Sequence, residues 1–352
     1  KGVLLLGLGG QCVGPAAVDL LYGNVNPSVK LTETYPFELQ DTPAFLQFGK
    51  RFTTEYREGI YVGYRYYEKA KKNVRFPFGF GLSYTTFDYS DLKLSAVRIG
   101  EEETLTISLK VRNTGDFAGK EAVQVYVAPP PSSIFKPEKE LREFGKVFLQ
   151  AGEEQEFIFT LGKRAFAYWN VNLNDWHVES GTYRILVGSS SADIRCEAAV
   201  EVTSRRPDAA VPAYRTSAPM YYQLPDATLD VPRDQFQVVY GKAIPAPEPP
   251  KGARFTANST LWDGRKSIVG RYLMKIFKAR MKEALGEAGG QDESFTHMVE
   301  AMMNDMPLRS FTMSGVSFPM LEGILLLLNG KYLKGFKILR REMKTIKVDL
   351  TS

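Results

Sequence analysis

The sequence contains few of the residues that build disulfide frameworks and metal sites. In 352 residues there are two cysteines, Cys12 and Cys196, and two histidines, His177 and His297. Two cysteines cannot form a disulfide framework and suggest a reducing compartment, although they leave a single bridge open. Neither histidine has a second ligand at a metal-binding spacing. We therefore expect no metal, no cofactor and a cytoplasmic location, with secretion left open.

The chain also lacks long hydrophobic runs and a strong charge of one sign. Its longest apolar run, Ile324–Leu328, is far too short to span a membrane. The formal net charge is +5, but residues 251–352 hold 17 Lys and Arg against 10 Asp and Glu, whereas the rest holds 28 against 30. A basic tail without a recognition motif does not indicate a nucleic-acid-binding protein. We expect neither nucleic acid nor a membrane as a partner.

The N-terminal end has the pattern of one part of a larger sheet. Residues Val3–Leu8 form an apolar run typical of a strand that is buried on both faces, as in parallel sheets. Gly9 and Gly10 then lead into a helix predicted over Gly14–Tyr22. A lone strand and one helix cannot form a sheet, and the chain lacks an initiator Met. We therefore expect the chain to be a fragment whose partner strands precede Lys1, with Val3–Leu8 left as an exposed apolar edge.

The stretch Glu55–Ser90 is rich in Tyr, Phe and Gly, in the runs GIYVGYRYY and FPFGFGLSY. Alternating aromatics are typical of pleated strands, and glycines allow bends with close backbone approach. The rings could stack on sugars, but aromatics interleaved with valine and glycine more often pack at a seam between domains. Packing is therefore the favoured interpretation. The residues concerned are Tyr61, Tyr64, Tyr66, Tyr67, Phe76, Phe78, Phe80 and Phe87.

From about residue 92 to residue 203 the pattern changes to short alternating strands. Turns such as Asn113-Thr114-Gly115 separate them, and no helical pattern lies between them. The predicted strands are Leu105–Val111, Ala122–Val127, Phe157–Leu161 and Thr182–Val187. Strands of this length and spacing indicate a β-sandwich.

The stretch from Pro207 to Pro250 holds nine of the twenty prolines. Proline fixes φ and removes a backbone donor, so we expect an extended connector with little room for helix. Apolar anchors indicate that this connector wraps along a domain surface. They are Met220, Tyr221, Tyr222, Phe236 and Tyr240.

The last hundred residues carry apolar side chains at helical spacing. Helices are predicted over residues 268–281, 295–306, 318–328 and 333–346, and Ser317 is the expected N-cap of the third. We expect the last helix to pack through Leu333, Phe336 and Leu339. A solvated basic outer face is favoured over docking to an anionic membrane or a partner's groove. The cations of this face are Lys331, Lys334, Lys337, Arg340, Arg341, Lys344 and Lys347.

Several motifs resemble, in order and spacing, those of family 3 glycoside hydrolases. They include GGQ at residues 9–11, GNVNPSVKL at 23–31, VGYRY at 62–66, FPFGFGLSYT at 76–85, NTG at 113–115, GKE at 119–121, KEL at 139–141 and VGSS at 187–190. The resemblance covers residues 1 to about 203. Residues 258–310 are similar to the C-terminal extension of bacterial β-glucosidase-like members. Val29 stands where the family has glycine, and a positive φ there would strain the valine.

The resemblance implies a mixed fold of four segments. Residues 1–82 would be the C-terminal edge of an α/β-sandwich domain, and residues 83–203 an all-β fibronectin type III-like sandwich. Residues 204–257 would be an extended proline-rich linker, and residues 258–352 an all-α C-terminal extension.

The resemblance also implies an activity that this chain cannot perform alone. The family uses a retaining mechanism, with an Asp nucleophile on an N-terminal barrel and a Glu acid/base on a sandwich loop, and neither position is present. We therefore predict a C-terminal, structural portion of an exo-acting, β-glucosidase-like hydrolase, with no catalytic, cofactor-binding or metal-binding residue. Its partners would be the missing barrel and sandwich domains of the same polypeptide and, through them, an oligosaccharide or glycoside. Homo-oligomerisation stays open.

Other residues suggest an alternative, a non-catalytic module that binds carbohydrate or another protein. Trp169 and Trp176 flank a short loop that could hold a glycan, although a hairpin tip resting on a neighbouring domain is the simpler interpretation. Glu55 and Glu58 could form a carboxylate pair, but we expect them to face different ways and to bond to Arg57 or Arg65. His177 and His297 are expected to be satisfied or exposed histidines.

Overall fold

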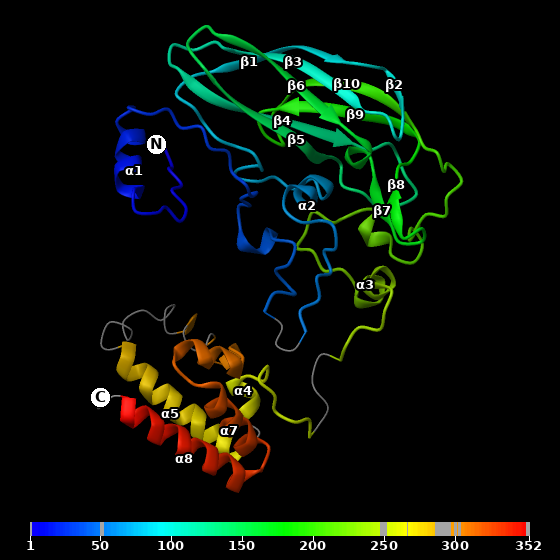
Figure 1. The fold of residues 1–352 in the computed structure, drawn as a ribbon. Helices are drawn as coiled ribbons and strands as arrows, with labels where there is room; N and C mark the ends of the chain where they lie inside the picture. Colours follow the sequence, from blue (N-terminus) through cyan, green and yellow to red (C-terminus); the bar gives the residue numbers. More distant parts are fainter. Residues whose placement is uncertain are drawn as a thin grey trace. The chain divides into compact units, whose positions relative to one another are not determined.

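The computed structural model describes residues 2–49, 53–246, 252–265, 267–285, 297, 298, 301 and 304–349. The chain divides into two compact units, one of residues 1–50 with 54–245 and one of residues 51–53 with 246–352. The first unit contains the strands and the second contains helices (Figure 1). Each unit is described by itself.

The first unit is built on a β-sandwich (Figure 1). One sheet has the strand order β1-β3-β6 and the other the order β2-β10-β9-β4-β5. Neighbours are antiparallel except β2 and β10, which are parallel. The strands are β1 (Phe87–Leu94), β2 (Arg98–Gly100), β3 (Leu105–Asn113), β4 (Gly119–Ala128), β5 (Glu140–Leu149), β6 (Glu154–Leu161), β9 (Gly181–Gly188) and β10 (Ile194–Thr203). The predicted β-sandwich is confirmed.

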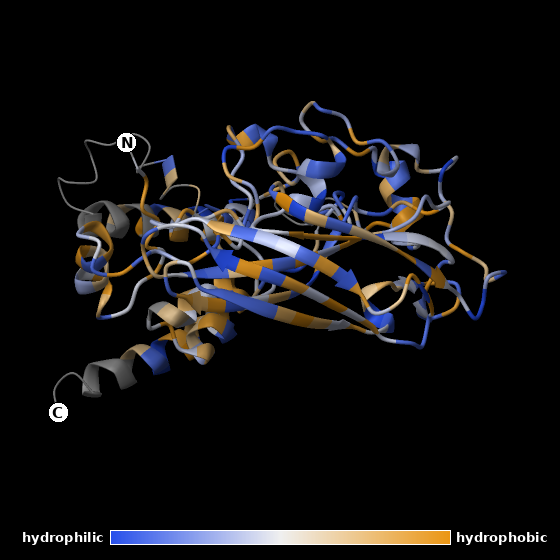
Figure 2. Cartoon of the chain, turned by 90° about the horizontal axis from the view of Figure 1, so that it is seen from above, coloured by the Kyte–Doolittle hydropathy of each residue, from blue (hydrophilic) through white to orange (hydrophobic). Residues whose placement is uncertain are grey.

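The core of the sandwich follows from alternation along each strand. In β3 the side chains of Leu105, Ile107, Leu109 and Val111 are buried, and the residues between them are more exposed. Figure 2 shows the same alternation of apolar and polar residues along the strands. Because a fully buried aliphatic side chain contributes about 1.5–3 kcal/mol, this alternation is the main stabilising term of the unit.

The segment before the sandwich differs in part from the expectation. Helix α1 (Val13–Leu21) confirms the predicted helix, with both ends one residue earlier. Residues Val3–Leu8 form no strand and are exposed, as expected for an uncovered apolar segment, with Val3 86% exposed. A strand exists only through ladder hydrogen bonds to a neighbour, and no described residue pairs with this segment. The predicted buried strand is therefore wrong for this structure.

In the aromatic stretch a helix replaces the predicted strands. Helix α2 (Tyr64–Lys69) begins after Gly63, which has a φ of 58°. The adjacent residues Tyr66 and Tyr67 are both buried. A strand would turn neighbours to opposite faces, whereas a helix lets both lie on its covered side. A short 3-10 turn, η1 (Leu39–Asp41), precedes this stretch.

The connector wraps along the first unit, as predicted, but it contains a helix that was not expected. Helix α3 (Arg233–Tyr240) follows Pro232 at its N-cap and ends at Gly241, which has a φ of 70°. The prediction of little room for helix was wrong because Pro232 and Pro245 flank a proline-free stretch. The buried anchors of the connector are Ala218, Tyr221 of the turn η3 (Pro219–Tyr221), Leu224, Leu229 and Val231.

The second unit is helical, as predicted. Its elements are α4 (Leu261–Gly264), α5 (Ile268–Leu285), η5 (Leu308–Ser314), α7 (Phe318–Leu328) and α8 (Tyr332–Asp349). Ser317 is the predicted N-cap of α7, since its Oγ accepts a hydrogen bond from the Met320 N–H at 3.2 Å. The helix predicted over 295–306 lies largely outside the described residues. Within the described ranges no helix is long and apolar enough to cross a membrane.

The packing of α8 corrects a further expectation. Leu339 faces α7, where its side chain lies close to Gly323. Leu333 and Phe336, which were expected to pack with it, are exposed instead. The close approach of the two helices at Gly323 and Gly335 covers Leu339 and leaves Phe336, three residues earlier, beside the contact.

Candidate functional site: the aromatic junction

The aromatic junction, residues 55–90, is held by buried tyrosine hydroxyls. The Tyr61 O–H donates to the Tyr221 carbonyl at 2.6 Å, and the Tyr221 O–H donates to the Arg57 carbonyl at 2.7 Å. The ring of Phe135, from the loop before β5, stacks on Tyr221 with centroids 5.0 Å apart. These contacts join residues up to 164 positions apart in the sequence, so the junction ties the connector to the sandwich unit.

Burial keeps these tyrosines protonated. It raises the pKa of Tyr66 and of Tyr67 to about 12, and it raises the pKa of Tyr61 further. A protonated, enclosed phenol neither transfers protons at neutral pH nor offers its face to a sugar. The packing interpretation is confirmed for these three residues. Tyr64 also packs, since its ring stacks on Phe78 with centroids 4.8 Å apart.

Glu55 and Glu58 lie in different environments, as expected, and do not act as a pair. Burial opposes ionisation of Glu55, but hydrogen bonds from Arg57 at 2.8 Å and Arg233 at 3.1 Å outweigh it and lower the pKa of Glu55. Glu58 is buried, and burial raises its pKa. Arg65, an expected partner, lies 3.4 Å from Glu140 instead. Glu55 is thus a clamp between the junction and α3.

The helix of the junction is fixed to the five-stranded sheet by polar contacts. The Leu141 N–H donates to the Tyr64 hydroxyl at 2.8 Å. The Glu68 carboxylate lies 2.7 Å from the Lys139 Nζ, and burial, only partly offset by Lys139, raises the pKa of Glu68. Tyr64 belongs to the quoted motif VGYRY, and Lys139 and Leu141 belong to the quoted motif KEL. The motifs therefore meet in space because they build one interface.

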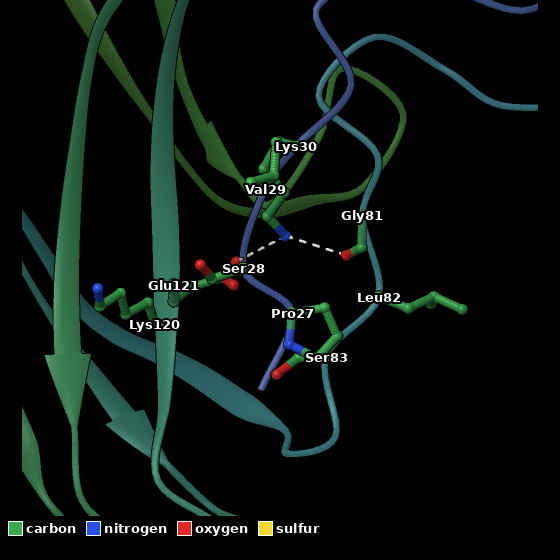
Figure 3. A pocket seen from close by; sticks show the side chains of 9 residues that line it. All are labelled: Pro27, Ser28, Val29, Lys30, Gly81, Leu82, Ser83, Lys120 and Glu121. Carbon is green, nitrogen blue, oxygen red and sulfur yellow. Dashed lines mark hydrogen bonds and ion pairs between the residues drawn. The ribbon is translucent and has the colours of Figure 1, made fainter. Parts of the chain in front are cut away.

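A small pocket lies where the 23–31 turn meets β4 (Figure 3). The Lys30 Nζ is 3.2 Å from Glu121 Oε1 and 3.3 Å from the Gly81 carbonyl, and the Tyr89 O–H donates to the same Glu121 oxygen at 2.8 Å. These contacts engage the Lys30 Nζ, the Glu121 Oε1 and the Gly81 carbonyl. Its lining consists of Pro27, Ser28, Val29, Lys30, Gly81, Leu82, Ser83, Lys120 and Glu121.

The turn beside this pocket is held by Asn26. Its Nδ2 donates to the Ala118 carbonyl at 3.0 Å, while its Oδ1 accepts from Ser83 Oγ at 2.9 Å and from the Tyr84 N–H at 2.8 Å. Val29 does not have a positive φ, so the valine is not strained there. At Gly81 a Cβ would lie 2.4 Å from the Val29 carbonyl, so glycine is required for this close approach.

The two tryptophans lie on a hairpin, as expected, and only one offers a free ring. Strands β7 (Tyr168–Asn170) and β8 (Asp175–His177) place Trp169 opposite Trp176, with centroids 5.5 Å apart and planes at 73°. The guanidinium of Arg164, which lies in the turn η2 (Lys163–Ala165), covers the Trp176 ring at 3.3 Å. Trp169 is 45% exposed. Two perpendicular rings, one of them covered, do not form a flat sugar platform.

The histidines and cysteines form no metal centre within the described residues. His177 is buried, and burial lowers its pKa. Its Nδ1 has no hydrogen-bond partner among the described residues, which corrects the expectation of a satisfied or exposed histidine. His297 lies on a short described helical piece, outside any such centre. Cys12 and Cys196 are free thiols.

The sequence did not predict that Phe135 and Glu55 both bind residues of the connector at the junction. No local pattern marks Phe135, because its partner Tyr221 is distant along the chain. Glu55 was matched to Arg57, but its second partner, Arg233, belongs to a helix that was not predicted. The described junction is therefore a structural interface that joins the turn at residues 23–31, the sandwich and the connector.

Comparison with known proteins gives this architecture a family. Residues 1–84 match the glycosyl hydrolase family 3 C-terminal domain, and residues 121–191 match a fibronectin type III-like domain. The chain is 51% identical over 205 residues to thermostable beta-glucosidase B of Acetivibrio thermocellus, which covers 58% of this chain and 27% of that protein. It is 46% identical over 195 residues to an exo-alpha-(1->6)-L-arabinopyranosidase of Bifidobacterium breve, covering 55% and 25% respectively.

Solved structures of β-glucosidases also resemble this part of the chain. A GH3 beta-glucosidase of Bifidobacterium adolescentis is 41% identical with a TM-score of 0.54, over 61% of this chain and 32% of that one. Beta-glucosidase 3B of Thermotoga neapolitana in complex with glucose is 38% identical with a TM-score of 0.51, over 56% and 27%. The chain spans about a quarter of the length of the curated relatives it matches. The chain carries a segment that matches the glycosyl hydrolase family 3 C-terminal domain, followed by a fibronectin type III-like domain, and its relatives over this part are β-glucosidases and an arabinopyranosidase.

Proposed function

We propose that this chain works as the C-terminal portion of a retaining, exo-acting glycoside hydrolase of the β-glucosidase type. The observation that carries the proposal is the match of residues 1–84 and 121–191 to two successive domains of family 3 enzymes. Relatives of the same part include β-glucosidases and an arabinopyranosidase, so the proposed reaction is hydrolysis of an O-glycosidic bond at a chain end. The sugar itself is left open.

The proposed role of this portion is structural. Glu55 is bound to two arginines, Glu68 to Lys139 and Glu121 to Lys30, so these three carboxylates serve as anchors. The proposed catalytic Asp and Glu come from the barrel and the sandwich loop of the complete enzyme. The proposed domain boundaries are those implied by the resemblance, which divide the chain into residues 1–82, 83–203, 204–257 and 258–352.

The proposed partner of the N-terminal segment is the rest of the enzyme. Val3, Leu5 and Leu8 are exposed, although isolated apolar side chains of this size favour burial. Strands of an α/β sandwich would cover them and supply the missing ladder hydrogen bonds. The contacts of Asn26 would then hold the completed sheet against the fibronectin type III-like domain.

Complementation tests the proposal. The chain is mixed with the upstream part of the Acetivibrio thermocellus enzyme, and hydrolysis of an aryl β-glucoside is measured. We expect no turnover by either piece alone and measurable turnover by the mixture. Asn26→Ala, which removes three hydrogen bonds, should weaken the activity of the mixture, whereas the matched variant Asn24→Ala loses only a bond to Asp19. Hydrolysis by the pure chain alone would refute the structural role.

A second candidate, a non-catalytic carbohydrate-binding module, rests on the exposed ring of Trp169. Affinity electrophoresis of the chain in gels containing soluble β-glucans tests it. Retardation that Trp169→Ala abolishes would favour the module. Unchanged migration of both proteins would leave only the enzymatic proposal.

A further inference from the structure

Helix α8 is oriented by a glycine contact with α7. A Cβ on Gly335 would lie 2.7 Å from Leu327 Cδ2 and 2.8 Å from the Gly323 carbonyl oxygen, so the two backbones approach closely at this point. One turn further along α8, Leu339 lies against Gly323, and Glu342 accepts a hydrogen bond from Ser317 Oγ at 3.1 Å. Residues at spacings of three and four therefore mark the inward side of α8.

Beside this inward side, α8 carries apolar side chains in solvent. Leu333 is 89% exposed and Phe336 63% exposed. Met343, two turns beyond Phe336, and Tyr332 are also more than half exposed. Large apolar side chains that recur at helical spacing on one exposed face mark an interaction surface, because single scattered ones would not align. We call these four residues, together with the exposed cations Lys334, Lys337 and Arg340, the outer face of α8.

The cations Lys334, Lys337 and Arg340 of this face have no partners within the described part of the chain, whereas the neighbouring Arg341 lies 3.4 Å from Glu342. Lys334, Lys337 and Arg340 are exposed, and no described carboxylate lies within ion-pair distance of them. Some lysines of the first unit are paired: Lys30, Lys69 and Lys72 each have a carboxylate within 3.2 Å. The outer face of α8 thus combines unpaired positive charge with exposed apolar side chains.

The positive charges on the outer face of α8 indicate what kind of partner binds there. Arg340 lies between Phe336 and Met343 on the outer face, where burial in a dry protein groove would leave its charge unpaired. At a bilayer surface the apolar side chains enter the acyl boundary, while lysine and arginine extend to lipid phosphates. Although the sequence pattern favours a solvated face, we propose that α8 lies parallel to the surface of an anionic phospholipid bilayer and binds it through this outer face.

Vesicle co-sedimentation of the full chain tests this proposal. One set of vesicles is phosphatidylcholine alone, and the other has a third of it replaced by phosphatidylserine. Binding should need the anionic lipid and should weaken as salt is raised. The triple variant Lys334→Glu, Lys337→Glu, Arg340→Glu should lower the partition coefficient at least roughly a hundredfold, because each cation near such a surface contributes about a factor of five. The double variant Leu333→Ser, Phe336→Ser should lower it roughly tenfold or more.

Control variants distinguish binding through the outer face of α8 from non-specific binding of the chain to vesicles. Lys71→Glu, Lys93→Glu, Lys120→Glu makes the same change in net charge on exposed residues of the first unit and should leave binding within about twofold. Phe144→Ser, at another exposed aromatic, should do likewise. No anionic-lipid dependence, or equal loss in the control variants, would overturn the proposal. So would a concentration-dependent dimer that Phe336→Ser abolishes, since a second copy would then cover the face.

Discussion

The two units of this chain use the same residue types in opposite ways. In the sandwich unit the aliphatic residues of β3 are enclosed, and cations such as Lys30 and Lys139 are paired with carboxylates. In the helical unit, Leu333 and Phe336 face solvent beside Lys334 and Lys337, two cations without a partner among the described residues. The difference teaches that a periodic apolar pattern identifies a helix or strand, but not the face that is covered.

The comparison is tested most strongly by removing one leucine from each unit. Leu109→Ala in β3 should lower the free energy of unfolding by about 2–5 kcal/mol, because it leaves a cavity in the enclosed core. Leu333→Ala on α8 should change it by less than about 0.5 kcal/mol, since that side chain is already in water. Urea unfolding followed by circular dichroism measures both. Equal losses would mean that α8 is covered in solution.

A bulky residue at the α7–α8 contact should have the next largest effect. Gly335→Leu places side-chain atoms where Leu327 and the Gly323 carbonyl already lie, so the helices must separate, at a cost of about 1–3 kcal/mol. Gly14→Ala in α1 is the control, because nothing lies within 4 Å of the added Cβ. Thermal melting of each variant, followed by helical circular dichroism, compares them. An unchanged transition for Gly335→Leu would show that the glycine contact does not orient α8.

Loss of a single buried hydroxyl at the junction should cost less. Tyr61→Phe removes the hydrogen bond to the Tyr221 carbonyl and should destabilise the first unit by about 1 kcal/mol. Tyr56→Phe changes an exposed tyrosine and should be neutral. Guanidinium unfolding gives both values. Identical unfolding midpoints for the two variants would mean that the hydrogen bond of the Tyr61 hydroxyl does not stabilise the junction.

The smallest expected effect concerns pH and is confined to the sandwich unit. Burial lowers the pKa of His177 below its ordinary value of 6.5, so the unfolded chain binds the proton more readily than the folded one. Its contribution to stability is complete above about pH 6.5 and is lost as pH falls through the folded pKa. Compared with His177→Gln, the unaltered chain should therefore lose more stability between about pH 6.5 and pH 5. A constant difference across this range would contradict the assignment.

Much of the fold could be predicted, and the failures share a cause. Leu105–Val111 was recognised as a strand and Phe318–Leu328 as a helix, because each shows its period within a few residues. The run Val3–Leu8 also has the composition of a buried strand, but a strand needs a neighbour, and the described chain supplies none. The aromatic composition around Tyr66 and Tyr67 favours a strand, but in the structure both of these neighbouring side chains are buried, which a helix allows.

The site could be predicted only as a list of motifs. Residues 62–66, 76–85 and 139–141 were each recognised, and the structure joins them through Tyr64, Phe78 and Leu141. The contact of Tyr61 with Tyr221 could not be derived, because 160 residues separate them. Arg233 was missed as a clamp on Glu55 for the same reason.

The sequence by itself determined the family resemblance, the class of each segment and the positions of most strands and helices, because these depend on local spacing and on motif order. Only the tertiary structure decided which side of α8 faces inward, which tyrosines are enclosed and which carboxylates are paired. Those outcomes depend on contacts between distant residues, such as Gly323 with Gly335 and Lys30 with Glu121. Burial and pairing are properties of the assembled surface, and no single segment carries them.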